Sequence, residues 1–488
     1  MSLRDSRRHS APASSPASND LSRRKFIGAC CAAVGTTGML SALAQLRMIG
    51  ALASTDGSGV AAATGPDFKA LVCLFLAGGN DANNLIIPYD ATDYAAYATS
   101  RGALALPQAP LLPIAPRTSD GRSWALHPAM PELQSLFGQG KFALLGNVGT
   151  LVVPVTQAQY NGRTVPLPPQ LFSHNDQSVQ WQSSVPDKPF QTGWGGRLAD
   201  LTNALNGNNQ ISMSVSLAGQ NAFQVGRYVS QYAVGPGGAI RLSGSATGAT
   251  TAAGVRTTAQ NELLAQQDPN LFAAAFGGMT SDAISDSALL SGVVSATAPF
   301  TTTFPTSSLG QQLRMIARLI GARDQLGLKR QVFFARVGGW DLHDNQVDAT
   351  DTTTGAHATL LRDVSLSLKA FYDATVEMGV PDRVTTFTAS DFGRTYNTNG
   401  RGSDHGWGSH HLILGGAVKG GDVYGRIPNL TIGGPDDTGR GRWIPTTSVD
   451  EYNSTLALWF GVSPSNLSTV LPNIGRFHTT DLGFMNAG

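Results

Sequence analysis

The chain has 488 residues, of which 41% are hydrophobic and 14% are charged. That apolar content is ample for a buried core, so a wholly disordered chain is excluded. The formal net charge is +1, but residues 1–53 carry seven basic and two acidic side chains, which leaves the rest of the chain at −4. A mildly acidic body lacks the basic surface that DNA and RNA require, so we expect no nucleic-acid partner.

The first feature in chain order is a leader. Arg23 and Arg24 precede an apolar stretch, rich in Ala and Gly, that runs from Phe26 to about Leu43. This order is typical of a twin-arginine signal peptide, which is an address for a receptor rather than an anchor. We therefore assign residues 1–53 to a signal peptide, with an uncleaved membrane anchor as the alternative. Export by the twin-arginine translocase would place the mature protein in the periplasm or outside the cell.

The remaining residues, 54–488, are predicted to form one large α/β domain. Four short apolar runs, each soon followed by a turn with Gly, Asn or Asp, are typical of buried strands: 69–76, 142–145, 331–337 and 384–388. Apolar residues at helical spacing occur in 309–320 and 361–371. Strands that alternate with amphipathic helices predict a mostly parallel central sheet between helix layers. No later run is long enough to span a bilayer, so we expect no transmembrane helix in the mature chain.

Residues 200–308 differ from the rest in composition. They are rich in Ala, Gly, Ser and Thr and poor in charge. This composition favours an insertion or cap on the α/β domain. A linker between two domains is the alternative.

Aspartates follow three of the predicted strands: Asp81, Asp341 and Asp391. The carboxyl ends of parallel strands form the ligand crevice of such sheets, so we expect these carboxylates to meet there. Asp341 and His343 are two residues apart and point to the same side of an extended segment, which suits two ligands of one metal ion. An oxygen ligand beside an imidazole favours Zn, Mn or Fe over Ca, although a purely structural pair is the alternative.

Two further segments concentrate polar residues. Residues 172–177 include Ser173 and His174, and residues 404–411 include three of the nine histidines. Such groups are costly to place near a core unless they bind something, yet a surface loop would also explain them. Arg394 follows Asp391 closely and suits a group that holds an anion. A divalent ion would remove the repulsion between crowded carboxylates and activate an oxygen nucleophile.

The motifs G-G-N-D-x-x-N, S-H-x-D-Q, G-G-W-D-x-H-x-x-Q, S-D-F-G-R-T and D-H-G follow one another along the chain. With the leader, they resemble the bacterial family known as domain of unknown function 1501, from about Leu71 to Phe477. That family looks like a branch of the alkaline phosphatase and sulfatase superfamily. The resemblance implies an α/β/α sandwich with one or two divalent ions at the strand ends.

The resemblance also implies roles for individual residues. The metal ligands would be Asp81, Asp341, His343, Asp391 and His405, with Asp341, His343 and His405 on one ion and Asp81 and Asp391 sharing a second. Ser173 would be the nucleophile, and Arg394 or Asn84 would hold the substrate anion.

One position departs from the superfamily pattern. Phe392 stands where the superfamily commonly has a histidine ligand. His174, His410 or His411 would replace that ligand, or the second ion would be weakly bound or absent. Asn84, His174 and His410 are the candidates for contact with the substrate.

These features predict an exported metal-dependent hydrolase of phosphate or sulfate esters, acting on a small-molecule or polymer substrate. The alternative is a non-catalytic exported binding or assembly protein with the same fold and a degraded metal site. A redox protein with a larger cofactor lacks any cofactor motif here.

Overall fold

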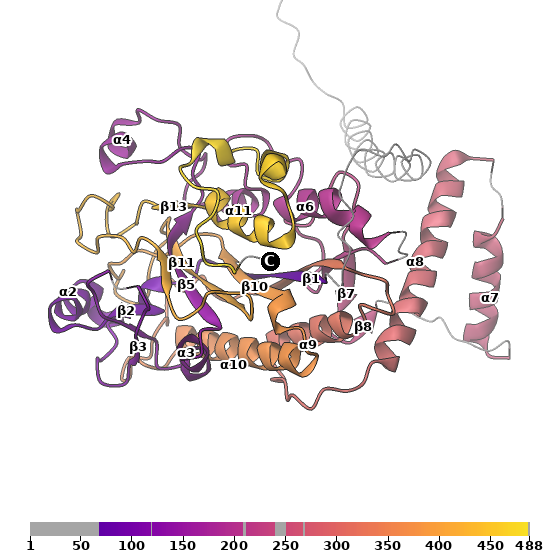
Figure 1. Ribbon diagram of the computed structural model, residues 1–488, viewed down its shortest axis with the longest axis horizontal. Coiled ribbons are helices and arrows are strands. Elements are labelled where there is room, and N and C mark those ends of the chain that lie inside the picture. The colour runs from indigo at the N-terminus through magenta and orange to yellow at the C-terminus, as the bar shows by residue number, and fades with distance from the viewer. Residues whose placement is uncertain (1–67, 119, 208–210, 240–249, 267–268, 487–488) are drawn as a thin grey trace, which may run out of the picture. The chain divides into compact units, whose positions relative to one another are not determined.

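Among the described residues, ten strands form one central sheet (Figure 1). In spatial order these are β12 (Val423–Gly425), β5 (Phe142–Gly149), β11 (Ser409–Gly415), β10 (Val384–Ser390), β1 (Lys69–Leu76), β9 (Arg330–Val337), β6 (Ser214–Ser216), β7 (Tyr232–Gly235) and β8 (Gly238–Ala239), with β13 (Thr447–Ser448) beside β5. Every pair is parallel except those made by β11 and β8. The predicted mostly parallel sheet is confirmed.

The computed structural model describes residues 68–118, 120–207, 211–239, 250–266 and 269–486. They all belong to one compact unit of the chain. The predicted signal peptide at residues 1–53 lies outside the described residues. None of the described helices combines the length and the hydrophobicity that a membrane crossing needs.

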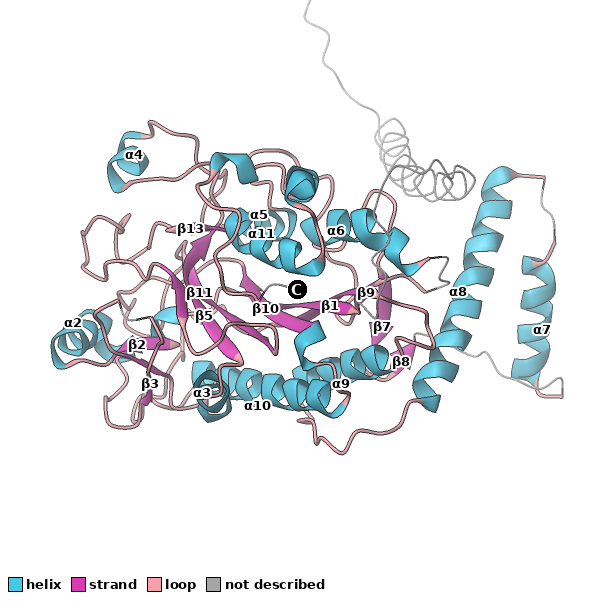
Figure 2. Cartoon of the chain, viewed as in Figure 1, coloured by secondary structure: helices cyan, strands magenta, loops and turns pink. Residues whose placement is uncertain are grey.

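Helices cover both faces of the sheet (Figure 2). One layer contains α3 (Pro131–Gly138), α9 (Ser308–Gly321) and α10 (Ala356–Glu377), and the other contains α5 (His174–Ser183), α6 (Trp194–Thr202) and α11 (Val449–Phe460). The remaining helices are α2 (Ala91–Arg101), α4 (Gln157–Gly162), α7 (Ala252–Leu264), α8 (Leu271–Ala296) and α12 (Leu467–Val470). A smaller sheet consists of β2 (Ile86–Pro88), β4 (Trp124–Leu126) and β3 (Leu112–Ile114). Short 3-10 helices occur at Ala82–Asn84, Gly102–Leu104, Asn203–Asn206, Pro381–Arg383, Pro464–Asn466 and Ile474–Arg476.

The three central strands end level with one another. All eight residues of β1 are buried, which is why its sequence is a continuous apolar run rather than an alternating one. Burial of each large apolar side chain contributes about 2 kcal/mol. Leu76 of β1 pairs with Val337 of β9 on one side and with Ser390 of β10 on the other. The loops that follow these strands therefore begin at the same edge of the sheet.

The predicted helices are also present. Leu309, Leu313, Ile316 and Ile320 of α9 are all fully buried, as their spacing predicts. Helix α10 ends at Glu377, and Gly379 follows its C-cap Met378 with a positive φ of 69°, a conformation that glycine adopts readily after a helix.

The Ala/Gly/Ser/Thr-rich stretch at 200–308 contains two kinds of structure. Its strands β6, β7 and β8 extend the central sheet beyond β9. Its helices α7 and α8 pack against each other, and α8 also contacts β8. Among the described residues of this stretch, the three strands thus belong to the central sheet, whereas α7 and α8 do not.

Residues 404–411 do not form a surface loop throughout. Ser409 begins strand β11, which runs antiparallel to both β10 and β5. His410 and His411 are buried in that strand. The apolar residues Leu412, Ile413 and Leu414 that follow continue the strand into the core, and they explain why this segment is a strand.

Four buried histidines make the stability of the fold depend on pH. Burial lowers the pKa of His127 and His411 to about 3 and of His357 and His410 to about 4. In the unfolded chain each returns to about 6.5. Below that pH the unfolded chain takes up protons that the folded protein does not, so stability falls as the pH drops toward 4. We expect a loss on the order of 2 kcal/mol per histidine at pH 5, measured by chemical denaturation at pH 7 and pH 5.

A pair of variants controls this prediction. His411→Gln removes one titrating group from the core and should reduce the loss between the two pH values. His478→Gln changes an exposed histidine and should leave the loss as it is. Equal stability of the wild type at pH 7 and pH 5 would contradict the prediction.

Candidate metal centre

Asp391 and Asp341 lie together beyond the ends of β10 and β9. The backbone N–H of Gly78, just past β1, lies 3.2 Å from each carboxylate oxygen of Asp391. Gly78 has a φ of +122°, and a Cβ atom there would lie 2.5 Å from the backbone nitrogen of Asp341. Only glycine permits this approach, so Gly78 allows the three strand ends to meet.

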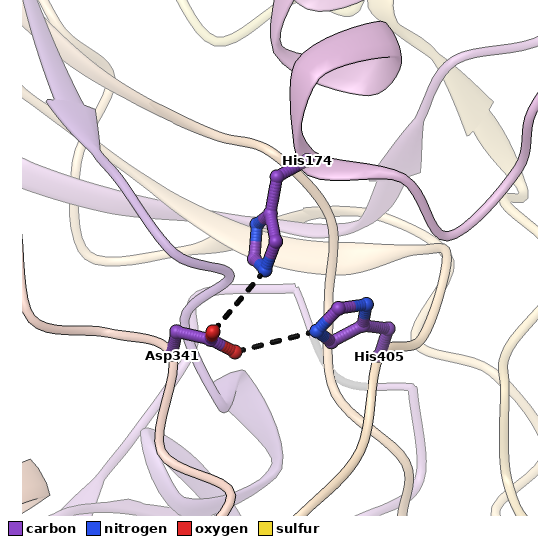
Figure 3. Close-up of side chains that lie close together, drawn as sticks. All are labelled: His174, Asp341 and His405. Atoms are coloured by element: carbon purple, nitrogen blue, oxygen red, sulfur yellow. Dashed lines mark hydrogen bonds and ion pairs between the residues drawn. The ribbon is translucent and has the colours of Figure 1, made fainter.

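Three side chains converge on this edge: His174, Asp341 and His405 (Figure 3). Nε2 of His174 lies 3.4 Å from Oδ2 of Asp341, and Nε2 of His405 lies 3.3 Å from Oδ1. One ligand atom from each residue falls within 4.8 Å of the other two. His174 is the first residue of α5, Asp341 follows β9, and His405 precedes β11. Distant parts of the chain thus build a group that could hold a metal ion.

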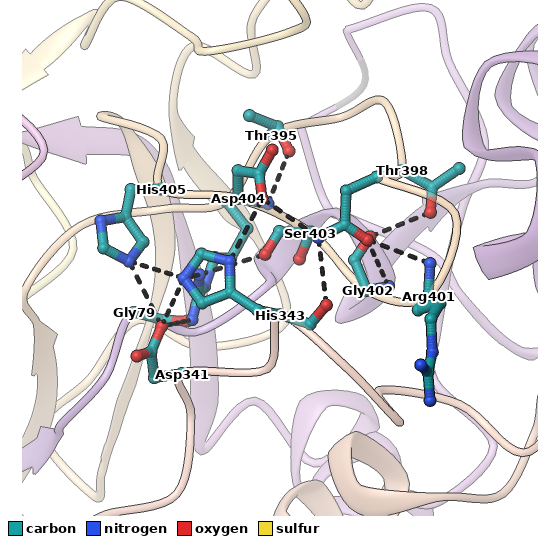
Figure 4. A network of polar contacts seen from close by, with 12 residues as sticks. Gly79, Asp341, His343, Thr395, Thr398, Arg401, Gly402, Ser403, Asp404 and His405 are labelled. Carbon is teal, nitrogen blue, oxygen red and sulfur yellow. Dashed lines mark hydrogen bonds and ion pairs between the residues drawn. The ribbon is translucent and has the colours of Figure 1, made fainter.

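His343 adjoins the same group (Figure 4). Its Nε2 atom lies 3.1 Å from Oδ1 of Asp341 and 2.9 Å from Nε2 of His405. The Asp341 and His343 side chains therefore share a side, as their spacing predicts. The side chains of Asp341 and His343 are 47% and 43% exposed, so a solute can reach the group from outside.

Each of the three imidazoles is oriented by a hydrogen-bond acceptor outside the group. Nδ1 of His174 lies 2.6 Å from Oδ2 of Asp391, and Nδ1 of His343 lies 3.1 Å from Oδ1 of Asp404. Nδ1 of His405 lies 2.8 Å from the carbonyl oxygen of Phe172. Carbonyl and carboxylate oxygens only accept, so each Nδ1 carries the proton and each Nε2 turns its lone pair toward the group.

This pattern is characteristic of histidines that bind a metal ion. Metal-bound imidazoles usually donate their second nitrogen to a carboxylate or a backbone carbonyl. Two Nε2 lone pairs that face each other at 2.9 Å repel unless a cation or a proton lies between them. In a tetrahedral zinc site the ligand atoms lie about 3.3 Å apart, close to the separations of 2.9–3.4 Å found here. The residues fit Zn, Mn or Fe.

Electrostatics keep the carboxylate of Asp341 and that of its neighbour Asp404 ionised. Burial would raise the pKa of Asp341, but the Arg394 guanidinium and the neighbouring histidines hold it below its ordinary value. Burial would also raise the pKa of Asp404, yet hydrogen bonds from Asn399, Arg440 and His343 lower it to about 2. Burial lowers the pKa of His405, so its imidazole stays neutral at pH 7. Ionised carboxylate and neutral imidazole are the forms that bind metal ions.

Phe392 forms a wall behind two of the imidazoles. Its ring centroid lies 4.7 Å from that of His174 and 4.6 Å from that of His405. Of the three histidines considered as replacements for the missing ligand, the structure brings His174 to the group. His410 instead accepts a hydrogen bond from the backbone N–H of Asn147, and His411 packs against Trp181.

Arg394 reaches the group but has no free donor. Its side chain is fully buried, and it donates to Asp341, to His343 and to four backbone carbonyls, those of Gly78, Gly79, Trp340 and Ser403. Because every N–H is used within the protein, Arg394 joins the loops after β1, β9 and β10 and orients Asp341. A dissolved anion has no access to it.

Asp81 and Asn84 belong to a separate buried network. The Asp81 carboxylate pairs with Arg101 and accepts from Gln346 at 2.5 Å and from Asn83 at 3.0 Å. Burial would raise the pKa of Asp81, but the charge of Arg101 and these hydrogen bonds hold it below its ordinary value. The Asn84 side chain accepts from Tyr97 and Arg101 and donates to the carbonyl of Leu104. The structure thus does not bring Asp81 or Asn84 to the group around Asp341.

Ser173 directly precedes His174 at the start of α5. Although it occupies the N-cap position, its hydroxyl does not cap the helix and donates instead to Oδ2 of Asp176 at 2.5 Å. Asp176 and Asp404, the partners of Ser173 and His343, were not predicted from the sequence. The only indication of these two aspartates in the sequence is their position in the motifs S-H-x-D and D-H-G.

Fold and site together define an α/β protein with a candidate histidine–carboxylate metal centre at the carboxyl ends of its parallel strands. The family model described as "Protein of unknown function (DUF1501)" matches residues 68–435. The chain belongs to this family.

Solved structures similar to this chain include the PsFucS1 sulfatase from Pseudoalteromonas sp., with 11% identity, coverage of 82% of this chain and 69% of that one, and a TM-score of 0.31. Another is Ps i-CgsB in complex with k-i-k-neocarrahexaose, with 10% identity, coverage of 82% and 74%, and a TM-score of 0.30. Among curated proteins, none matches the sequence significantly.

The hydrogen bond from Nδ1 of His174 to Asp391 can be tested by substitution. Asp391→Asn keeps the size of the side chain but removes the carboxylate that fixes the proton on Nδ1 of His174. Loss of such an outer partner costs 10- to 100-fold in metal affinity. We expect the affinity for Zn²⁺, measured by competition with a chelator, to fall by about that factor while the number of bound ions per chain is unchanged.

The matched control is Asp348→Asn, which changes an exposed carboxylate outside the group. It should leave the affinity for Zn²⁺ unchanged. Loss of one bound ion from the Asp391→Asn protein would instead make Asp391 a direct ligand, as the family resemblance implies, and would contradict an outer role.

Proposed function

We propose that this protein is an exported metal-dependent hydrolase of phosphate or sulfate esters. The observation that carries the proposal is the convergence of three imidazoles on Asp341, each with its Nδ1 proton held by an outer acceptor. His174, His343, His405 and Asp341 are the residues that would hold a divalent ion. Such an ion, when bound, polarises an ester oxygen and stabilises developing negative charge.

Ser173 supplies the hydroxyl for attack on phosphorus or sulfur. Its proton points at the Asp176 carboxylate, 2.5 Å away, so Asp176 is the group that receives the proton as the new bond forms. As that bond forms, the bond to the alcohol of the ester breaks, and the alcohol takes up the proton that Asp176 received. Water then attacks the ester formed on Ser173, which releases phosphate or sulfate and restores the Ser173 hydroxyl. Ser173 directly precedes His174, so attacking group and candidate ligand are positioned by the same turn at the start of α5.

Buried supports hold the site rigid. Arg394 holds Asp341 in place through a guanidinium that also binds four backbone carbonyls. Phe392 packs against His174 and His405 and keeps water from their inner side. Rigid positioning of reacting groups lowers the entropy cost of reaching the transition state.

Export is the second part of the proposal. It rests on the paired Arg23 and Arg24 before an apolar, Ala/Gly-rich stretch. The twin-arginine pathway carries folded proteins, which suits a protein that binds its metal ion before export. The mature protein would then act in the periplasm or outside the cell.

A non-catalytic binding protein is the second candidate. The observation in its favour is the ion pair between Arg394 and Asp341, because a buried cation already neutralises the carboxylate. In that case the guanidinium would stand in for the metal ion and the group would have no hydrolytic role.

Metal analysis separates the two candidates. We expect the folded wild-type protein to retain at least one transition-metal ion per chain and to hydrolyse an aryl phosphate or an aryl sulfate. Asp341→Ala, which removes the carboxylate common to all three imidazole contacts, should lose both the ion and the activity. His478→Ala, at an exposed histidine, should keep both. A wild-type protein without metal or activity would favour the binding protein.

Ser173→Ala tests the nucleophile alone. The variant should retain its metal ion, because no contact of the group uses Ser173, while kcat falls by at least about 100-fold. Wild-type kcat in Ser173→Ala would remove Ser173 from the mechanism and leave the metal site standing.

A further inference from the structure

A groove of about 710 Å³ lies along the segment between α4 and α5. Its walls combine an aromatic ring, amides, a cation and aliphatic side chains: Tyr160, Asn161, Arg163, Leu167, Gln170 and Leu171. None of these residues belongs to the metal group, so the groove is a separate feature of the surface.

The groove wall continues into the metal group. Leu171 directly precedes Phe172, whose carbonyl accepts the Nδ1 proton of His405. The Tyr160 ring lies 5.9 Å from that of Trp407, two residues after His405. The segment that lines the groove is thus joined to the metal group through Phe172 and Trp407.

Arg163 provides an available positive charge in this wall. Its side chain is exposed, and within the described part of the chain its guanidinium makes no hydrogen bond or ion pair. The other arginines of this region are engaged: Arg440 with Asp404, Arg442 with the carbonyl of His405, and Arg394 as described above.

The backbone of this wall is held in an unfavourable conformation. Seven non-glycine residues of the described chain have a positive φ. Two of them line the groove, Gln170 and Arg163, which is the left-handed C-cap of α4, and a third, Phe172, directly follows the groove wall. L-residues other than asparagine and aspartate seldom adopt this conformation. Such strain persists where the surroundings enforce it, and it is concentrated at ligand sites.

We propose that this groove binds an anionic group of the substrate at a distance from the ester that is cleaved. The volume lies within the range of small-molecule sites and exceeds what a single sulfate or phosphate needs. Tyr160, Leu167 and Leu171 offer apolar surface to an organic scaffold, while Arg163 pairs with its charge. The ligand class is an organic molecule with several sulfate, phosphate or carboxylate groups. That this ligand is the substrate rests on the proposed function.

A binding experiment tests the groove without catalysis. Sucrose octasulfate, a carbohydrate with several anionic groups, is titrated by calorimetry into the full chain carrying Asp341→Ala. Arg163→Asn, which removes the charge but tolerates a positive φ, should weaken binding roughly tenfold or more, and Arg163→Lys should retain most of the affinity. Arg256→Asn, at an exposed arginine of α7, is the matched control and should change nothing. Equal affinities of the Arg163→Asn and Arg256→Asn proteins would overturn the proposal.

A kinetic experiment then connects the groove with the reaction. Two aryl esters are compared, one with a second anionic group and one without. Arg163→Asn should raise KM by a larger factor for the ester with the second anionic group. For that ester, kcat should change less than KM. Equal factors for the two esters would overturn the role in substrate binding. Because the calorimetric result depends on Arg163 alone, a failure of the hydrolase proposal remains distinguishable from a failure of the groove.

Discussion

The candidate site depends on one constraint: three imidazoles must present Nε2 to the same carboxylate. A free imidazole offers either nitrogen, so the protein must select one. It does so with three different acceptors, a strand-end carboxylate for His174, a loop carboxylate for His343 and a backbone carbonyl for His405. Asp391 can lie where it does because Gly78 lets the ends of β1, β9 and β10 approach each other. Backbone packing and histidine chemistry are thus linked at the same edge.

Much of the fold follows from the sequence because local patterns dictate it. A strand buried on both faces needs a continuous apolar run, and β1 has one from Lys69 to Leu76. Strand β11 was missed because His410 and His411 have polar side chains, although the core accommodates both as neutral rings. The expected strand-end aspartates were found where parallel strands place them, but the sequence could not show which of them a buried arginine would bind.

The candidate site illustrates that limit. Asp81 and Asp391 both follow buried strands, yet Arg101 pairs with Asp81 from twenty residues further along the chain, and only the packing of α2 brings the two together. His174 approaches the group because α5 begins beside β10, a contact between distant segments that no spacing reveals. Phe392, where the superfamily commonly has a ligand, leaves a flat apolar face on which His174 and His405 rest. Phe392 thus occupies the position where the resemblance implies a ligand, and its ring packs against the imidazoles of His174 and His405 instead.

The two candidate functions differ in what neutralises the Asp341 carboxylate: a metal ion in the hydrolase, and Arg394 alone in the binding protein. Arg394 and a metal ion would both neutralise this carboxylate. Arg394 donates to Oδ1, which also faces His343 and His405, whereas Oδ2 faces His174. X-ray absorption spectroscopy of the purified full-length protein loaded with Zn²⁺ tests this directly. We expect the zinc ion to be coordinated at about 2.0–2.1 Å by several imidazole nitrogens and one carboxylate oxygen. A shell without imidazole signatures, or a protein that takes up no zinc, would contradict it.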